Sequence, residues 1–236
     1  MALTDITNPT PESEDKALLH LLQLVSPGLP VGAYSYSEGL ETWIAAHKIV
    51  DGVSLHAWLQ HQLQYGSVRI DTAAMLRGYR AVVAGDRAGL CFWNHWLSAT
   101  RETEELRQAA WQMGKSLADL LAAIAPTTQP WLDACESPRN FALVFGIAAA
   151  TWGIDEHHAT LGYLHAWSSN LIHAGVRLIP IGQTTAQKIT YQLSSDIEKA
   201  AHAIAALPND DLESCTWGLS LASMQHETLY SRLCRS

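Results

Sequence analysis

The chain has 236 residues, of which 48% are hydrophobic and 16% charged, and its formal net charge is −8. This length suits one domain with a substantial core, and the acidic balance without a basic run excludes a surface that would neutralise nucleic-acid phosphates. Nine tryptophans on such a weakly charged chain favour association with a partner protein.

The first predicted element is a polar, acidic tail. Residues 1–16 lack the basic start and apolar centre of a signal peptide, so we expect them to be disordered. An amphipathic helix follows, because apolar residues recur three and four positions apart at Leu18, Leu21, Leu22 and Val25.

The segment SPGLPVGAYSYSEGLE, residues 26–41, interrupts this helical pattern. Its prolines and glycines predict a fixed turn. We expect Ser35, Ser37 and Glu38 to cap the helix that begins at GLETWIAAHK, with Tyr34 and Glu38 on an exposed face. On these grounds alone the segment is a well-capped turn between helices.

Helical periodicity continues through the rest of the chain. One predicted helix follows a cap at Ser54, and another contains Met113 to Ile124. Two more start at Ser137-Pro138 and at Asp155, and a last one spans Thr185 to Leu207. Residues 125–130 are interpreted as a loop, and no segment alternates as a strand does. We therefore predict an all-α fold, a compact, bundle-like single domain.

The same sequence argues against a membrane span and a disulfide framework. The apolar stretch from Phe141 is too short to cross a bilayer and suits a buried helix, so we expect no membrane partner and a cytoplasmic protein. The four cysteines, Cys91, Cys135, Cys215 and Cys234, form no CxxC pair and are expected to be free thiols.

Catalytic motifs are missing from the sequence. It has no phosphate loop, dinucleotide fingerprint, zinc-protease motif or hydrolase elbow. Cys135 paired with a distant histidine would be an improvised nucleophile, and a structural role suits a lone cysteine better. We therefore predict that the protein is not an enzyme.

Four segments, in order, resemble the urease accessory protein UreF family. They are LPVGAYSYSEGLE (29–41), RETEELRQAAWQMGKSL (101–117), RLIPIGQTTAQ (177–187) and MQHETLYSRLCRS (224–236). The resemblance covers about residues 17–236. Its visible departure is Cys234, where the family usually has phenylalanine, and this puts an aromatic anchor in the tail in doubt.

The resemblance implies an all-α protein that dimerises, binds UreD (also called UreH), recruits the GTPase UreG and helps deliver nickel to apo-urease. It implies no stably bound cofactor, because nickel is handled transiently by the complex. In this interpretation residues 17–225 form the helical domain and residues 226–236 a tail that docks on a partner.

The same resemblance suggests which residues contact partners. These candidates are Tyr34, Glu38, Glu41, Arg101, Glu102, Glu104, Glu105, Arg177, Gln183, Arg232, Leu233 and Arg235. Structural alternatives remain open for them, since the charges at 101–107 also suit a solvated helix face, Gln183 a turn, and the last residues a frayed terminus.

Histidines are the natural nickel donors, and three lie on one face of the helix after Asp155. His158, His165 and His173 are seven and eight residues apart, which places neighbours about 10 Å or more apart along the axis. These weak candidates cannot by themselves chelate one ion. Two rival classes stay open: a helical small-molecule enzyme, which needs a pocket of convergent polar groups with perturbed pKa values, and an unrelated helical scaffold.

Overall fold

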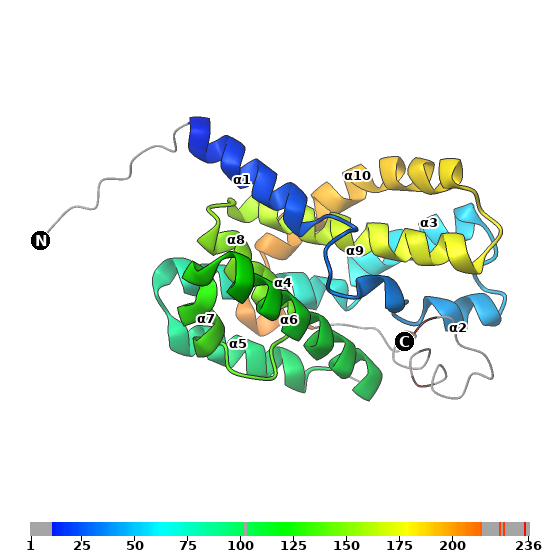
Figure 1. Cartoon of the computed structure of the whole chain (residues 1–236). Helices are drawn as coiled ribbons and strands as arrows, with labels where there is room; N and C mark the ends of the chain where they lie inside the picture. The colour runs from blue at the N-terminus through cyan, green and yellow to red at the C-terminus, as the bar shows by residue number, and fades with distance from the viewer. Residues whose placement is uncertain (1–10, 102, 214–221, 223, 225–233, 235–236) are drawn as a thin grey trace, which may run out of the picture.

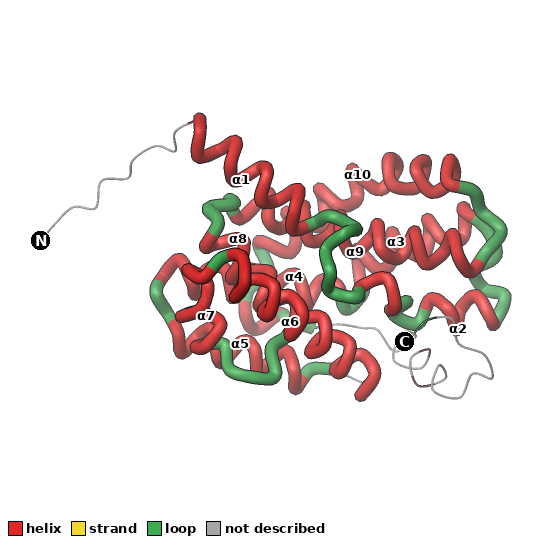
Figure 2. Tube along the Cα trace, viewed as in Figure 1, coloured by secondary structure: helices red, strands yellow, loops and turns green. Residues whose placement is uncertain are grey.

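The computed structural model describes residues 11–101, 103–213, 222, 224 and 234. This part consists of α-helices joined by turns and loops, with no strand (Figures 1 and 2). The helices are α1 (Pro11–Leu24), α2 (Leu40–Ala45), α3 (Gly52–Tyr65), α4 (Val68–Ala84), α5 (Arg87–Ala99), α6 (Glu104–Ile124), α7 (Gln129–Ala134), α8 (Phe141–Thr151), α9 (Glu156–Leu178) and α10 (Gln183–Ala205). Single 3-10 turns occupy Ala33–Ser35, Pro126–Thr128 and Asn209–Asp211. The all-α prediction is confirmed.

Helix α8 forms the centre of the core. Its residues 142–149 are all buried, as predicted for this apolar stretch. Glycines let its backbone approach α4: a Cβ on Gly146 would lie 2.5 Å from the carbonyl oxygen of Met75, and one on Gly78 would lie 2.7 Å from Leu143 Cδ1. Helices α3, α5, α6, α7, α9 and α10 each contact α4 or α8, and α1 and α2 contact α9. None of the described helices combines the length and the apolarity that a bilayer span needs.

Two groups of helices flank the central pair. Helices α9 and α10 pack along each other, and α10 packs against α3, while α5, α6 and α7 cover the other side (Figure 1). The connection at 25–39 runs from α1 across α9 to α2, where it contacts α9 through its 3-10 turn. This connection contains the segment that the sequence singles out.

Helix positions were predicted better than helix starts. Helix α3 is capped by the Asp51 side chain, which accepts from the Ser54 amide, while Ser54 Oγ accepts from the Asp51 amide. Ser54 is thus at the third helical position (N3) of a capping box, and Asp51 is the N-cap. The predicted cap and helix start at Ser137-Pro138 are also wrong, because α8 begins at Phe141 and its N-cap is Asn140.

The two ends of the described chain also differ from expectation. Helix α1 begins at Pro11, inside the predicted tail of residues 1–16, and the acidic Glu12 and Glu14 in its first turn favour a helix N-terminus. The described tryptophans are partly buried and most pack on the core, so they leave no exposed tryptophan patch. The exposed large apolar residues include Leu18, Leu19 and Leu22 of α1.

Candidate functional site

The connection between α1 and α2 owes its path to three residues with positive φ. Gly32 and Gly39 have φ of 76° and 78°, and Glu38 has φ of 48°. Gly39 is the N-cap of α2 and no side chain caps this helix. The predicted capping by Ser35, Ser37 and Glu38 is therefore wrong, because the left-handed turn directs Glu38 toward α9.

Three side chains on one face of α9 hold this connection. Trp167 donates from Nε1 to Glu38 Oε2 at 2.9 Å, and Asn170 donates from Nδ2 to the Ala33 carbonyl at 2.8 Å. Arg177 donates from Nη2 to the Tyr34 carbonyl at 2.6 Å. The Tyr34 backbone is thereby fixed while the residue remains 70% exposed, as predicted. A fixed backbone with an outward aromatic ring suits recognition of another protein.

Beneath the connection lies a cavity of about 170 Å³ with mostly apolar walls and a few charged groups. Asp71 and Arg101 form a two-pronged ion pair there, with Nη2–Oδ1 at 2.6 Å and Nη1–Oδ2 at 3.2 Å. Each side chain is only 12% exposed. Burial lowers the pKa of the Arg101 guanidinium, but the attractions of Asp71, Tyr163 and Glu38 together outweigh burial, so the pKa is raised.

Glu38 is an acid with a perturbed pKa in this cavity. Its pKa is about 7, because burial and the nearby Asp71 raise it while the Trp167 hydrogen bond and Arg101 lower it. Burial also raises the pKa of Tyr163 well above its usual range. The expectation that Glu38 lies on an exposed face is wrong, since the residue is only partly exposed and lines the cavity.

The charged segment 101–107 divides into two parts with different surroundings. Arg101 precedes α6 and turns inward, so it does not belong to a solvated helix face. Glu104 is exposed on α6, where it accepts from Arg107 and from Gln108 Nε2, the latter at 2.6 Å. Glu105 is partly buried on the same helix, and Glu102 lies outside the described residues.

Two described residues from the C-terminal part contact α2. The Cys234 amide donates to Glu41 Oε2 at 2.9 Å, and Thr42 Oγ1 donates to the Ala222 carbonyl at 2.9 Å. Arg177 also reaches Cys234 Sγ at 3.9 Å. Cys234 is 5% exposed, so a frayed terminus, the structural alternative for the last residues, is wrong at this residue.

The other candidates at this end keep their status as predictions. Arg232, Leu233 and Arg235 lie outside the described residues. Gln183 is the exposed first residue of α10. The structure thus brings three partner-binding candidates, Tyr34, Glu41 and Arg177, together with Cys234 near the C-terminus.

The three candidate histidines on α9, His158, His165 and His173, stay apart, as their spacing predicts. His158 contacts Asp155 at the helix start, His165 faces Ser169, and His173 lines the cavity beneath the connection. A different trio, Cys91, His95 and Glu136, meets elsewhere in the described chain. The i, i+4 spacing of Cys91 and His95 is the signal in the sequence that could have predicted this trio.

Comparison with known proteins places these features in one family. The UreF family model matches residues 49–194. Three relatives named urease accessory protein UreF are those of Nostoc sp. strain PCC 7120 (52% identical), Synechocystis sp. strain PCC 6803 (49%) and Chromohalobacter salexigens (37%). The matches cover 94%, 93% and 98% of this chain, and 97%, 98% and 99% of the relatives. The chain therefore belongs to the UreF family of urease accessory proteins.

Proposed function

We propose that this chain is a non-enzymatic helper in urease maturation. In this role it dimerises, binds UreD/UreH, recruits the GTPase UreG and assists the transient passage of nickel to apo-urease in the cytoplasm. The relatives' name supplies the link to urease. The partners and the nickel step are inferred from the family resemblance in residues 29–41, 101–117, 177–187 and 224–236.

The proposal of partner binding rests on one observation: the Tyr34 side chain is exposed, while its backbone is held by side chains of α9. Arg177 and Asn170 hold the carbonyls of Tyr34 and its neighbour Ala33. Because the backbone of the connection is already ordered, a partner that covers the Tyr34 ring does not incur the entropy cost of ordering that backbone. Arg177 also contacts Cys234 Sγ at 3.9 Å, so the connection and Cys234 meet at the same arginine.

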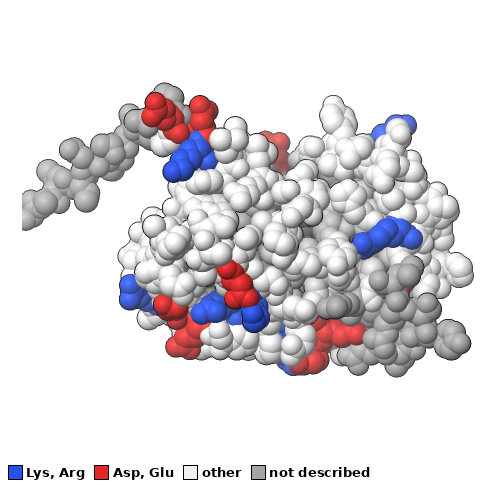
Figure 3. Space-filling model, viewed as in Figure 1, with Lys and Arg blue, Asp and Glu red and all other residues white. Residues whose placement is uncertain are grey.

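Association of two copies is supported by the apolar surface of α1. Leu18, Leu19 and Leu22 are 55%, 65% and 55% exposed, and such a cluster is unusual on a monomer. Figure 3 shows that the face between α1 and α9 carries few charged side chains. Light scattering tests this part of the proposal, with about twice 25.9 kDa expected and a strict monomer contradicting it.

The cavity and an acid with a perturbed pKa are features that the rival enzyme hypothesis requires. The two carboxylates of the cavity, however, are each bound to another side chain. Asp71 is neutralised by Arg101, and Glu38 accepts from Trp167. Burial raises the pKa of Cys135 to about 12, which makes its thiol a poor nucleophile. These contacts favour a structural role for the cavity groups.

Capture of purified UreD/UreH and UreG by tagged variants tests the proposal. Tyr34→Ala should fold normally and lose most of the capture, because it removes the exposed ring and leaves the carbonyl that Arg177 binds. Tyr191→Ala is the matched control, since Tyr191 is 83% exposed on α10, outside the family-like segments. Equal capture by both variants would contradict a docking role for the connection.

A further inference from the structure

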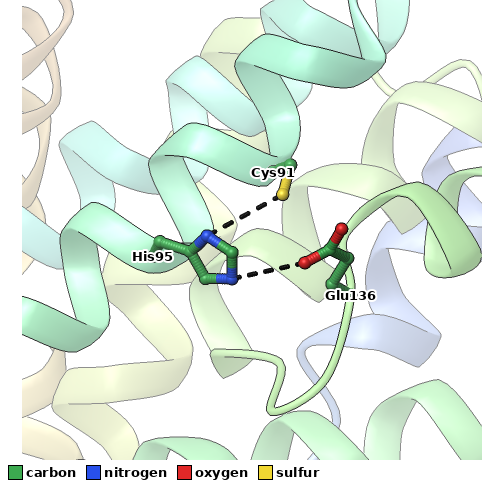
Figure 4. Close-up of side chains that lie close together, drawn as sticks. All are labelled: Cys91, His95 and Glu136. Atoms are coloured by element: carbon green, nitrogen blue, oxygen red, sulfur yellow. Dashed lines mark hydrogen bonds and ion pairs between the residues drawn. The ribbon is translucent and has the colours of Figure 1, made fainter.

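A thiol, an imidazole and a carboxylate converge on the side of the molecule formed by α5 and the α7–α8 connection. Cys91 and His95 lie one turn apart on α5, and Glu136 follows α7 (Figure 4). Cys91 Sγ is 3.8 Å from His95 Nδ1, and His95 Nε2 is 3.5 Å from Glu136 Oε2. One donor atom from each residue falls within 4.8 Å of the other two.

Two buried asparagines fix the connection that presents Glu136. Asn94 donates from Nδ2 to the carbonyls of Cys135 and Pro138, both at 2.9 Å. The Asn140 amide donates to Asn94 Oδ1 at 2.9 Å, and Asn140 Nδ2 donates to the Asn94 carbonyl at the same distance. Because Asn94 immediately precedes His95, the network sets the position of Glu136 relative to the two α5 side chains.

The backbone at Glu136 is itself unusual. Its φ is 53°, in the left-handed region that costs free energy for a residue with a Cβ. A glycine or asparagine would adopt this conformation more easily. Strained residues persist where the surroundings determine them, and they concentrate at functional sites. Here the strained residue is the one that supplies the carboxylate.

We propose that Cys91, His95 and Glu136 bind one Zn²⁺ ion, with solvent or a partner's side chain as the fourth ligand. Thiolate, imidazole and carboxylate are all zinc ligands, and three protein ligands with an open position are a familiar zinc arrangement. Bond lengths to zinc place tetrahedral ligand atoms about 3.5 Å apart. The present spacing requires a small closure, in which the imidazole turns one nitrogen toward the ion.

That closure is open to the side chains involved. The His95 and Glu136 side chains are 57% and 59% exposed, so both rotate without disturbing the core. A thiolate and a carboxylate also supply two negative charges to match a divalent cation. The thiolate and imidazole disfavour Mg²⁺ and Ca²⁺, which prefer oxygen ligands, and the site does not offer the planar set of nitrogen and oxygen donors that suits Ni²⁺.

The same trio has the connectivity of a thiol–imidazole–carboxylate nucleophile. Two observations disfavour that use. Burial and the neighbouring Glu136 raise the pKa of Cys91, whereas a reactive cysteine needs a lowered one. Glu136 also stands 3.5 Å from the imidazole, beyond a good hydrogen bond. A metal ion overcomes the first obstacle, because coordination itself deprotonates the thiol.

Cobalt spectroscopy on the reduced, chelator-treated full chain tests the site. Co²⁺ should give the near-ultraviolet thiolate charge-transfer band and the visible bands of a tetrahedral ion, and one equivalent of Zn²⁺ should displace it. Cys91→Ser should abolish the charge-transfer band. Changing a residue that only supports a ligand typically weakens metal binding by about 10- to 100-fold. His95→Ala and Glu136→Gln change the ligands themselves and should each weaken Zn²⁺ binding by about tenfold or more.

Matched controls separate this site from other thiols and imidazoles. Cys234→Ser, Cys215→Ser and His165→Ala should retain wild-type Zn²⁺ affinity, and circular dichroism should show every variant folded. The proposal is overturned if the three cluster variants bind Zn²⁺ as tightly as the wild type, if a control variant removes the charge-transfer band, or if Ni²⁺ binds more tightly than Zn²⁺. None of these results depends on urease partners, so a failed site leaves the proposed function untouched.

Discussion

Replacement of Glu38 by glutamine should make the protein more stable at high pH and remove part of its pH dependence. The native carboxyl has a pKa near 7 because of burial, against an ordinary value of 4.5. The native state therefore holds this proton more tightly than the unfolded state does. Its stabilising effect is complete below the unfolded pKa and is lost as the pH rises through the native pKa.

The size of the effect follows from those two values. Each tenfold change in proton affinity corresponds to about 1.4 kcal/mol, so the charged carboxylate lowers the free energy of unfolding by about 3 kcal/mol at high pH. Between about pH 5 and about pH 8 the advantage of Glu38→Gln over the wild type should grow by about 2.5 kcal/mol. Glutamine keeps an oxygen that accepts from Trp167 Nε1.

Urea denaturation followed by circular dichroism at several pH values measures this difference. Glu104→Gln is the matched control, because its neighbours Gln108 and Arg107 lower the pKa of Glu104. That variant should differ from the wild type by a constant amount over the same range and lose its difference only in more acidic solution. A Glu38→Gln advantage that does not change with pH would refute the burial of a titrating carboxyl in the cavity.

Three further changes test other parts of the structure. Arg101→Ala leaves Asp71 buried without its cation, so urea denaturation should show a loss of about 3 to 5 kcal/mol; a loss below about 1 kcal/mol would contradict the buried pair. Gly146→Ala places a Cβ against a backbone oxygen of α4, and the same measurement should show a cost of about 1 to 3 kcal/mol, while an unchanged midpoint would argue against the close contact. Glu136→Gly relieves a left-handed backbone and should raise the stability of the metal-free protein by up to about 1 kcal/mol relative to Glu136→Ala; equal midpoints for the two variants would refute the strain.

The fold was predictable where the helices are amphipathic. The apolar repeats of α3, α6, α9 and α10 identify these helices without any tertiary information. Helices α4, α5 and α7 were not identified, and α7 begins at Gln129 inside the predicted loop of residues 125–130. Helix α4 buries Asp71, Thr72 and Arg77 along with its apolar residues, and a search for apolar repeats does not anticipate polar residues on a buried face.

The candidate site was predictable only in part, because its contacts join distant segments. The family-like wording located Tyr34, Glu38 and Arg177, but not that Arg177 holds the Tyr34 carbonyl across 143 residues. Glu38 lines the cavity because its φ is positive, and no pattern of side chains in the sequence predicts this backbone conformation. Glu136 likewise reaches His95 only through the tertiary placement of its connection.

Activation of apo-urease is the most direct test of the proposed function. Purified apo-urease, UreD/UreH, UreG, GTP and Ni²⁺ are incubated with or without this chain, and urease activity and bound nickel are measured. The proposal predicts nickel-loaded, active urease only when the chain is present, with Tyr34→Ala deficient and Tyr191→Ala competent. Equal activation without the chain, at the same nickel concentration, would contradict it.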